Sequence, residues 1–417
     1  MDSFIVRGPC RLEGSVEVSG AKNAVLPLIT ASILTGGCCT LDNVPELRDT
    51  RTMIKLMEML GATVSFENGT VSVDASHLTS HEAPYDLVRT MRASIYALGP
   101  LVARYGRARV SMPGGCAWGP RPVNLHLQGL SALGAAIKID HGYIDATAEK
   151  LRGAEIVLPV PSVGATVNIL MAAVLAEGRS VIENAAREPE VVELATVLKE
   201  GGAGIEGEGT TRISIEGVSE ISPYRHRVIP DRIEAGTFAA AAVMTGSEIT
   251  IRTCRPDHLM AVIDKLRQCG GEFEIGDDHM TVRGPARIAP TDVETGFYPS
   301  FPTDMQAQMM AVLAGADGSS TVTDRVYPDR FTHVPELRRL GADIKLDGNI
   351  AVITGVGRLE GAPLMATDIR ASSALILAAL VAEGETKVLR IYHIDRGYEN
   401  LEKKLQALGA DIERITE

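Results

Sequence analysis

The heptapeptide LGADIKL occupies residues 340–346, and related segments are spread along the 417-residue chain. They are LGATVSF (60–66), LGAAIKI (133–139), GGAGIEG (201–207), GGEFEIG (270–276) and LGADIER (408–414). Their second residues are Gly61, Gly134, Gly202, Gly271, Gly341 and Gly409, separated by 68 to 73 residues. This regular spacing indicates six copies of one structural unit of roughly 70 residues.

An amphipathic segment precedes the glycine of each copy, as in TRTMIKLMEM (50–59), LMAVIDKLRQC (259–269) and NLEKKLQA (400–407). Apolar residues recur there near helical spacing, which predicts a helix with one buried face. The glycine then predicts the end of that helix, because a left-handed residue commonly follows a helix C-terminus. The alternating residues after the glycine predict a strand.

A second pattern of small apolar residues also occurs six times and predicts helices buried on nearly all sides. The segments are 21–37, 91–106, 164–178, 233–246, 303–315 and 368–384. Each repeat therefore contains one buried helix, one amphipathic helix and several strands.

We predict an α/β (α+β) fold, because repeats of this size are too small to be stable singly and must share cores. Three repeats per domain is the natural grouping, with the boundary near Pro230. The predicted domains are 21–229, and 1–20 together with 230–417. A continuous solenoid of six repeats is the alternative.

Composition excludes several classes of partner. The net charge of −12 carries no acidic or basic block, which argues against a nucleic-acid or anionic-membrane surface. The N-terminus resembles no signal peptide and no apolar run is long enough to span a membrane, so we expect a cytoplasmic protein. Its six cysteines form no CxxC, and His77 and His81 lie in a loop-like segment, so we predict no metal and no cofactor.

The segment SMPGGCAWGPRP (111–122) is predicted to be a loop, since it holds three glycines and three prolines. Cys116 in such a loop is accessible, and Arg121 five residues later favours its thiolate form. These features predict a reactive thiol. The alternative is a tight surface turn with an inert cysteine.

Polar residues in the predicted buried helices gather at their first turns, where free N–H groups and the helix dipole favour anions. They are Lys22, Asn23, Arg92, Thr166, Glu234, Asp304, Asp368 and Arg370. If these helix starts share a cleft, that cleft suits a strongly anionic substrate. Ordinary capping is the alternative for Asp304 and Glu234, and a surface cation for Lys22 and Arg92.

The chain resembles the UDP-N-acetylglucosamine enolpyruvyl transferases in ordered blocks over its whole length. The blocks include SGAKNA (19–24), APYDLVRTMRAS (83–94), PGGC (113–116), PSVGAT (161–166), NAAREPE (184–190), IPDRIEAGTF (229–238), FPTDMQAQ (301–308), MATDIRAS (365–372) and IYHIDRGYE (391–399). The resemblance implies an inside-out α/β barrel in two domains of three repeats, with the active-site cleft between them. It also implies transfer of the enolpyruvyl group of phosphoenolpyruvate to the 3-hydroxyl of UDP-N-acetylglucosamine, with release of phosphate.

By the same resemblance, Cys116 donates a proton to phosphoenolpyruvate and can form a covalent adduct with it, and Asp304 is the candidate base. The residues implied around phosphoenolpyruvate are Lys22, Asn23, Arg121, Arg330, Arg370 and Arg396. Those implied around the nucleotide are Arg92, Arg121, Pro122, Val123, Asn124, Leu125, Ser162, Val163, Gly164 and the backbone of Val326. The oligomeric state stays open.

Two positions depart from the resemblance. Many relatives carry Asp where this chain has Asn124, and some carry Lys just before the SVGA block, where it has Val160 and Pro161. Both changes lie in the nucleotide region, so a free uridine nucleotide remains an alternative acceptor. Shikimate 3-phosphate is a further alternative, but the resemblance disfavours it, because the enzymes that use it lack the PGGC cysteine loop. A non-catalytic repeat protein explains the six repeats but not the cysteine loop.

Overall fold

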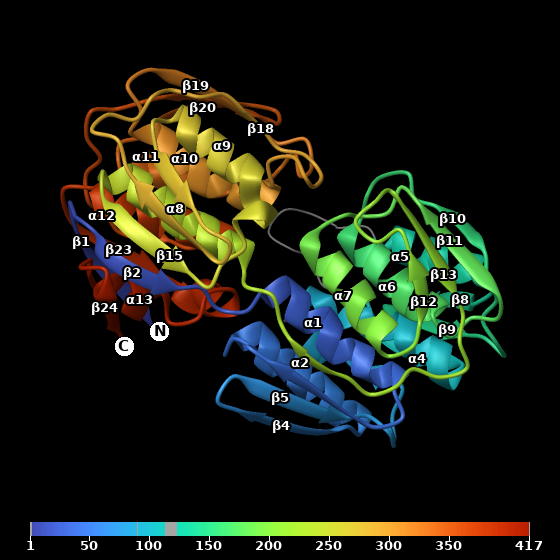
Figure 1. Cartoon of the computed structure of the whole chain (residues 1–417). Helices are drawn as coiled ribbons and strands as arrows, with labels where there is room; N and C mark the ends of the chain where they lie inside the picture. The colour runs from blue at the N-terminus through green and yellow to red at the C-terminus, as the bar shows by residue number, and fades with distance from the viewer. Residues whose placement is uncertain (1, 90, 113–122, 417) are drawn as a thin grey trace. The chain divides into compact units, whose positions relative to one another are not determined.

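The computed structural model describes residues 2–89, 91–112 and 123–416, which form two compact units. Unit 1 contains residues 2–19 and 230–416, and unit 2 contains the described residues from 20 to 229. Figure 1 shows that sheets lie around the helices within each unit. The predicted mixed α/β class is confirmed.

The described residues form six four-stranded sheets of one topology, three in each unit. In each sheet the pairing at one edge is parallel and the other two pairings are antiparallel. In unit 2 the orders are β14 (Arg225–Arg227), β3 (Cys38–Asp42), β5 (Thr70–Asp74), β4 (Thr63–Glu67); β6 (Glu82–Ala83), β7 (Arg107–Ser111), β9 (Tyr143–Thr147), β8 (Ala136–Asp140); and β10 (Glu155–Val157), β11 (Arg179–Glu183), β13 (Arg212–Glu216), β12 (Gly204–Glu206).

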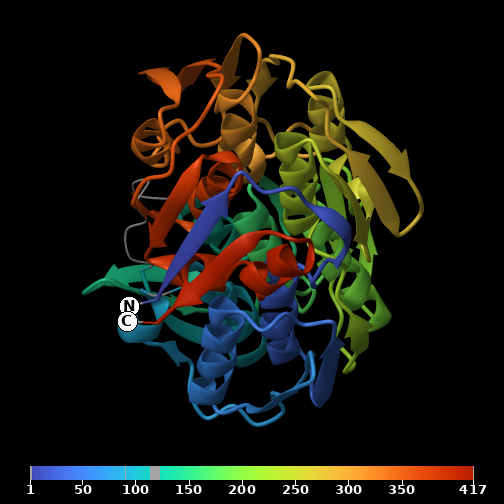
Figure 2. The ribbon, with the colours of Figure 1, turned by 90° about the vertical axis from the view of Figure 1, so that its left-hand side faces the viewer.

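Unit 1 repeats this topology. Its orders are β22 (Leu364–Met365), β23 (Gly384–Leu389), β1 (Ser3–Gly8), β24 (Asp411–Ile415); β16 (Glu272–Ile275), β17 (His279–Arg283), β15 (Glu248–Arg252), β2 (Glu13–Glu17); and β18 (Val293–Glu294), β19 (Ser319–Thr323), β21 (Ile350–Thr354), β20 (Asp343–Asp347). The N-terminal segment thus completes two sheets, and Figure 2 shows β1 beside the C-terminal strand with which it pairs.

The small-residue segments form the buried helices, as predicted. They are α1 (Lys22–Ala31), α4 (Leu98–Tyr105) and α6 (Val163–Ala173) in unit 2, and α8 (Arg232–Thr245), α10 (Gln306–Ala314) and α12 (Ile369–Val381) in unit 1. The amphipathic segments form α2 (Arg48–Leu60), α5 (Asn124–Ala132), α7 (Pro189–Glu200), α9 (Met260–Gln268), α11 (Val334–Arg339) and α13 (Leu401–Ala407). None of these helices has the length and hydropathy to cross a membrane.

The repeated glycines end the amphipathic helices in the left-handed region, as Gly61 (φ +105°) and Gly341 (φ +94°) illustrate. The fourth copy corrects the predicted register by one residue. There the left-handed residue is Gly270 (φ +99°), not Gly271, and buried Cys269 takes the place that leucine holds in four other copies.

The prediction of one continuous helix over 91–106 is wrong at its start. The segment begins as the 3-10 helix η2 (Arg92–Ala97) and becomes α-helical only at α4. Gly99 donates its N–H to the side chain of Asn168 (2.6 Å), and Pro100 has no N–H to donate. Two consecutive α-helical hydrogen bonds are therefore missing at this point.

Candidate functional site

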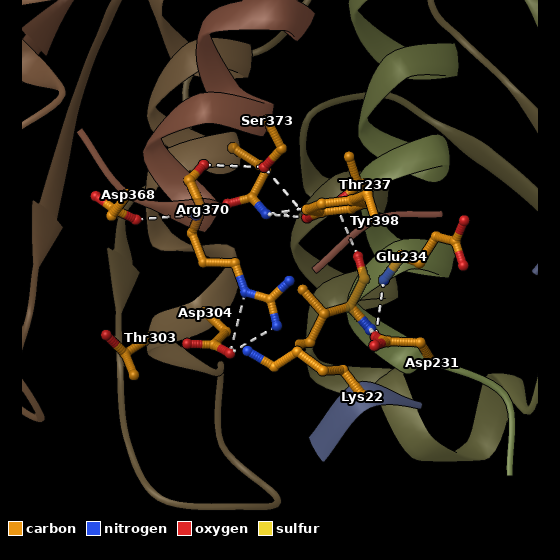
Figure 3. Close-up of polar contacts among 12 residues, drawn as sticks. Lys22, Asp231, Glu234, Thr237, Thr303, Asp304, Asp368, Arg370, Ser373 and Tyr398 are labelled. Atoms are coloured by element: carbon orange, nitrogen blue, oxygen red, sulfur yellow. Dashed lines mark hydrogen bonds and ion pairs between the residues drawn. The ribbon is translucent and has the colours of Figure 1, made fainter. Parts of the chain in front are cut away.

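Asp304 of unit 1 lies between two arginines, in the 3-10 turn η4 (Thr303–Met305) that leads into α10. Its Oδ1 accepts a hydrogen bond from Nη1 of Arg330 at 2.7 Å. Its Oδ2 accepts from Nε and Nη2 of Arg370 at 3.1 and 3.0 Å, as Figure 3 shows. One carboxylate thus holds two guanidinium groups together.

The pKa of Asp304 reflects two opposed effects. Burial raises the pKa, but the charges of Arg370 and Arg330 outweigh burial and hold it well below its ordinary value. The carboxylate side chain is 28% exposed, whereas those of Arg370 and Arg330 are 4% and 6% exposed. Asp304 is therefore ionised and open to solvent, but it is a weak base while both arginines contact it.

Asp368 fixes the start of α12 and with it Arg370. Its Oδ1 caps the helix by accepting from the N–H groups of Arg370 (2.9 Å) and Ala371 (3.0 Å). The Arg370 guanidinium lies over the ring of Tyr398, with its carbon 5.6 Å from the ring centroid. The Tyr398 hydroxyl lies 2.9 Å from Thr237 and donates to Ser373 at 3.2 Å, so the buried helices position this arginine (Figure 3).

The capping alternative for Glu234 and Asp304 is wrong, for different reasons. In α8 the cap is Asp231, which accepts from the N–H groups of Ile233 and Glu234. The carboxylate of Glu234 is buried and accepts instead from Lys404 Nζ (2.6 Å) and the N–H of Ser19 (2.8 Å). Asp304 is occupied by its two arginines.

Lys22 of unit 2 forms an ion pair at the start of α1. Its Nζ lies 3.3 Å from Oδ2 of Asp49, which comes from the first turn of α2. The two side chains are 12% and 5% exposed. Asp49 therefore holds the ammonium group in place, and the alternative of a freely solvated surface cation at Lys22 is wrong.

The residues predicted to bind the nucleotide lie at two helix starts of unit 2. Asn124 and Leu125 begin α5 after Val123, and Val163 and Gly164 begin α6 after its cap Ser162. In unit 1 the N–H of Val326 already donates to Asp324 Oδ1 (2.9 Å), which leaves its carbonyl as the backbone group for a ligand.

Three more predicted residues are partly exposed at helix ends. Asn23 lies at the start of α1, Arg92 at the start of η2, and Arg396 at the end of the 3-10 helix η5 (Ile391–Arg396). Thr166 accepts from the N–H of Ala186 and plays a structural role. Cys116, Arg121 and Pro122 lie outside the described residues.

The sequence interpretation missed two groups that the structure places beside predicted residues. Asp49 pairs with Lys22, and buried His126 of α5 bonds Asn168 of α6 (3.0 Å) close to Gly164. The sequence signal for Asp49 was a carboxylate in the first turn of an amphipathic helix. The signal for His126 and Asn168 was a polar residue in each of two apolar segments. No group of three or more His, Cys, Asp or Glu side chains suited to a metal occurs within the described ranges.

The low pKa of His126 predicts that the free energy of unfolding falls in acid. Burial, aided by the charge of Arg92, lowers its pKa from 6.5 to about 4. Between these values the unfolded chain binds a proton that the folded chain does not, so stability is fully present above pH 6.5 and falls as the pH drops. From pH 7 to pH 5 we expect a loss of about 2 kcal/mol from this group.

Urea unfolding of the wild type and of His126→Asn at both pH values measures this loss. The difference between pH 7 and pH 5 should shrink by about 2 kcal/mol in the variant. An unchanged pH difference would contradict the assignment of this proton to His126.

The family model for EPSP synthase (3-phosphoshikimate 1-carboxyvinyltransferase) matches residues 6–405. The chain belongs to this family. Curated relatives of this chain include proteins of Geobacter metallireducens (52% identical over 417 residues) and Desulfosudis oleivorans (53% over 416 residues). Each match covers 100% of both chains, and both relatives are named UDP-N-acetylglucosamine 1-carboxyvinyltransferase.

Two solved structures agree with the fold. The enolpyruvyl transferase NikO of Streptomyces tendae aligns with a TM-score of 0.91 at 27% identity, covering 100% of this chain and 99% of that one. EPSP synthase of Acinetobacter baumannii aligns over 100% of both chains with a TM-score of 0.77 at 18% identity, which concerns the fold alone. The predicted enolpyruvyl transferase fold in two domains is confirmed.

Proposed function

We propose that this protein transfers the enolpyruvyl group of phosphoenolpyruvate to the 3-hydroxyl of UDP-N-acetylglucosamine and releases phosphate, the first committed step of peptidoglycan precursor synthesis. The observation that carries the proposal is full-length identity of 52–53% to relatives named for this carboxyvinyl transfer. The site adds a physical argument, because an ionised carboxylate beside two guanidinium groups suits an anionic substrate and a hydroxyl.

The reaction proceeds by addition and elimination. The sugar oxygen bonds to C2 of phosphoenolpyruvate while C3 takes a proton, for which Cys116 is the proposed donor. The C2–O bond to phosphate then breaks and C3 returns a proton, so the product is an enol ether and inorganic phosphate. The proposal needs no cofactor.

Asp304 is proposed to orient the attacking hydroxyl and to accept its proton. As the structure stands, Arg370 and Arg330 depress its pKa and make it a weak base. The phosphate and carboxylate of phosphoenolpyruvate neutralise cations at which they bind, and each neutralised arginine raises the pKa of Asp304. Substrate binding itself thus makes the base competent.

The remaining site residues keep the roles implied by resemblance, as part of the proposal. Lys22, Asn23, Arg121, Arg330, Arg370 and Arg396 bind phosphoenolpyruvate. Arg92, residues 121–125 and 162–164 and the carbonyl of Val326 surround the nucleotide sugar, and Asp368 stays a predicted substrate-binding residue. We propose a cytoplasmic location, because the five cysteines within the described residues form no disulfide, as a reducing compartment favours.

An acceptor comparison tests this function. Phosphate release from phosphoenolpyruvate should require UDP-N-acetylglucosamine, and neither shikimate 3-phosphate nor uridine diphosphate should replace it. Activity with uridine diphosphate as the acceptor would show that this protein uses a different acceptor, and the residues Asn124 and Val160 would then reflect that specificity. Release without any acceptor would overturn the transfer.

Asp49→Asn should raise the KM for phosphoenolpyruvate about 10-fold, because the Lys22 ammonium loses the charged partner that holds it. The KM for UDP-N-acetylglucosamine should stay within about twofold, since we expect Asp49 to act through Lys22. Steady-state kinetics in each substrate separate the two constants. Asp86→Asn is the matched control, because that carboxylate is 87% exposed and pairs with Arg89 on the surface. Equal changes in both KM values would contradict the assignment.

A further inference from the structure

His126 directs one edge of its ring at the start of α6. The residue is 7% exposed, and its Nδ1 lies 3.0 Å from Nδ2 of Asn168. Its Nε2 has no hydrogen-bond partner within the part of the chain that the structure describes. A Cβ placed on Gly164 would lie 3.0 Å from that Nε2 and 3.1 Å from Cε1. The free nitrogen of a buried imidazole therefore faces the Gly164 backbone.

Asn168 determines which nitrogen of His126 carries the proton. Its Oδ1 accepts from the N–H of Gly99 at 2.6 Å, and its Nδ2 donates to the carbonyl of Ile95 at 2.8 Å. These two backbone groups fix the orientation of the amide, so Nδ2 also donates to Nδ1 of His126. The neutral ring then carries its proton on Nε2. With a pKa of about 4, because the ring is buried, His126 is neutral at pH 7 and presents Nε2–H as a donor.

The start of α6 supplies two further donors. The cap Ser162 accepts from the N–H of Ala165 through its hydroxyl (3.3 Å) and from Thr166 through its carbonyl (2.9 Å). Among the described residues, nothing accepts from the N–H groups of Val163 and Gly164. Such groups at a helix N-terminus favour an anion.

We propose that His126 Nε2–H donates a hydrogen bond to a phosphoryl oxygen of the nucleotide-sugar diphosphate, beside the N–H groups of Val163 and Gly164, and that Asn168 is its positioning residue. The identity of the ligand rests on the proposed function. The inference explains how this chain holds a diphosphate with uncharged Val160 preceding the helix. A neutral donor with a fixed proton supplements the helix dipole there.

Two substitutions separate the roles of the two ring nitrogens. In His126→Asn the short side chain keeps an acceptor for Asn168 near Nδ1 but loses the Nε2 donor. In His126→Gln the longer side chain carries its amide nitrogen to the place of Nε2. We expect His126→Asn to weaken uridine diphosphate binding about 10- to 100-fold, the usual effect of losing a hydrogen bond to a charged group. We expect His126→Gln to stay within about fivefold of the wild type.

Calorimetric titration with uridine diphosphate, and NMR titration with uridine, measure these effects. Uridine lacks phosphate, so its affinity should change less than about twofold in His126→Asn. His226→Asn is the matched control, since it removes a half-buried histidine of the same unit that bonds Glu193. It should leave both affinities unchanged, and circular dichroism checks that all variants are folded.

The inference is overturned by equal losses for uridine and uridine diphosphate, or by unchanged diphosphate affinity in His126→Asn. Nitrogen-15 NMR of the wild type gives an independent result. It should show the His126 proton on Nε2 and a shift of that resonance when uridine diphosphate binds, and a proton on Nδ1 would overturn the inference. None of these measurements uses turnover, so they fail separately from the proposed reaction.

Discussion

Replacing Cys116 with alanine should lower the rate of phosphate release by about 10²- to 10⁴-fold, the usual contribution of a positioned general acid. Alanine removes the only group that we propose to protonate C3 of phosphoenolpyruvate. The affinity for UDP-N-acetylglucosamine should stay close to that of the wild type, because the nucleotide contacts are made elsewhere. A coupled phosphate assay and calorimetry measure the two quantities.

The same thiol should be the one that the epoxide fosfomycin alkylates. Four other thiols are poor competitors, because burial raises the pKa values of Cys10, Cys39 and Cys269, and raises that of Cys254 to about 12. Peptide mass spectrometry should therefore find the added mass on Cys116. Full activity of the alanine variant, or modification at Cys10 or Cys254 instead, would contradict the assignment and revive the non-catalytic alternative.

Asp304→Asn should lower kcat about 10²- to 10³-fold, because an amide can neither accept the hydroxyl proton nor hold two guanidinium groups. The change also leaves the charges of Arg330 and Arg370, both nearly buried, without a carboxylate between them. We expect the free energy of unfolding to fall by about 3 kcal/mol. Urea unfolding and initial rates measure the two effects.

Phosphate should restore part of that lost stability. An inorganic phosphate ion offers the arginine pair the charge that the carboxylate supplied, so its addition should stabilise Asp304→Asn more than the wild type. Asp317→Asn is the matched control, because that carboxylate pairs with Arg287 on the surface with 71% exposure. A variant with wild-type kcat would show that Asp304 takes no part in the chemistry.

The fold could be predicted from the sequence because its signals are local and repeated. Five of the six recurring glycines end a helix by their own conformational freedom, and each small-residue segment is apolar enough to require burial. The one register error, at Gly271, arose because Gly270 and Gly271 are adjacent and only their backbone angles distinguish them. The 3-10 start at Arg92 depends on Asn168, 76 positions away, and no local pattern reveals it.

The site could be predicted only in part. Charge at the starts of buried helices made Lys22, Asp304 and Arg370 candidates, since the core of a buried helix needs no charged group. Their partners were not visible in the same way. Asp49 reaches Lys22 from another helix, and the proton position on His126 follows from two backbone groups around Asn168. Such pairings arise from tertiary packing, which sequence spacing does not encode.

The most direct test of the account is the structure of the product formed by the purified protein from phosphoenolpyruvate and UDP-N-acetylglucosamine. Mass spectrometry and proton NMR should show one enolpyruvyl group joined through an ether to the 3-oxygen of the sugar, with one phosphate released for each product molecule. Unaltered UDP-N-acetylglucosamine, or an enolpyruvyl group on any other atom, would contradict the proposed reaction.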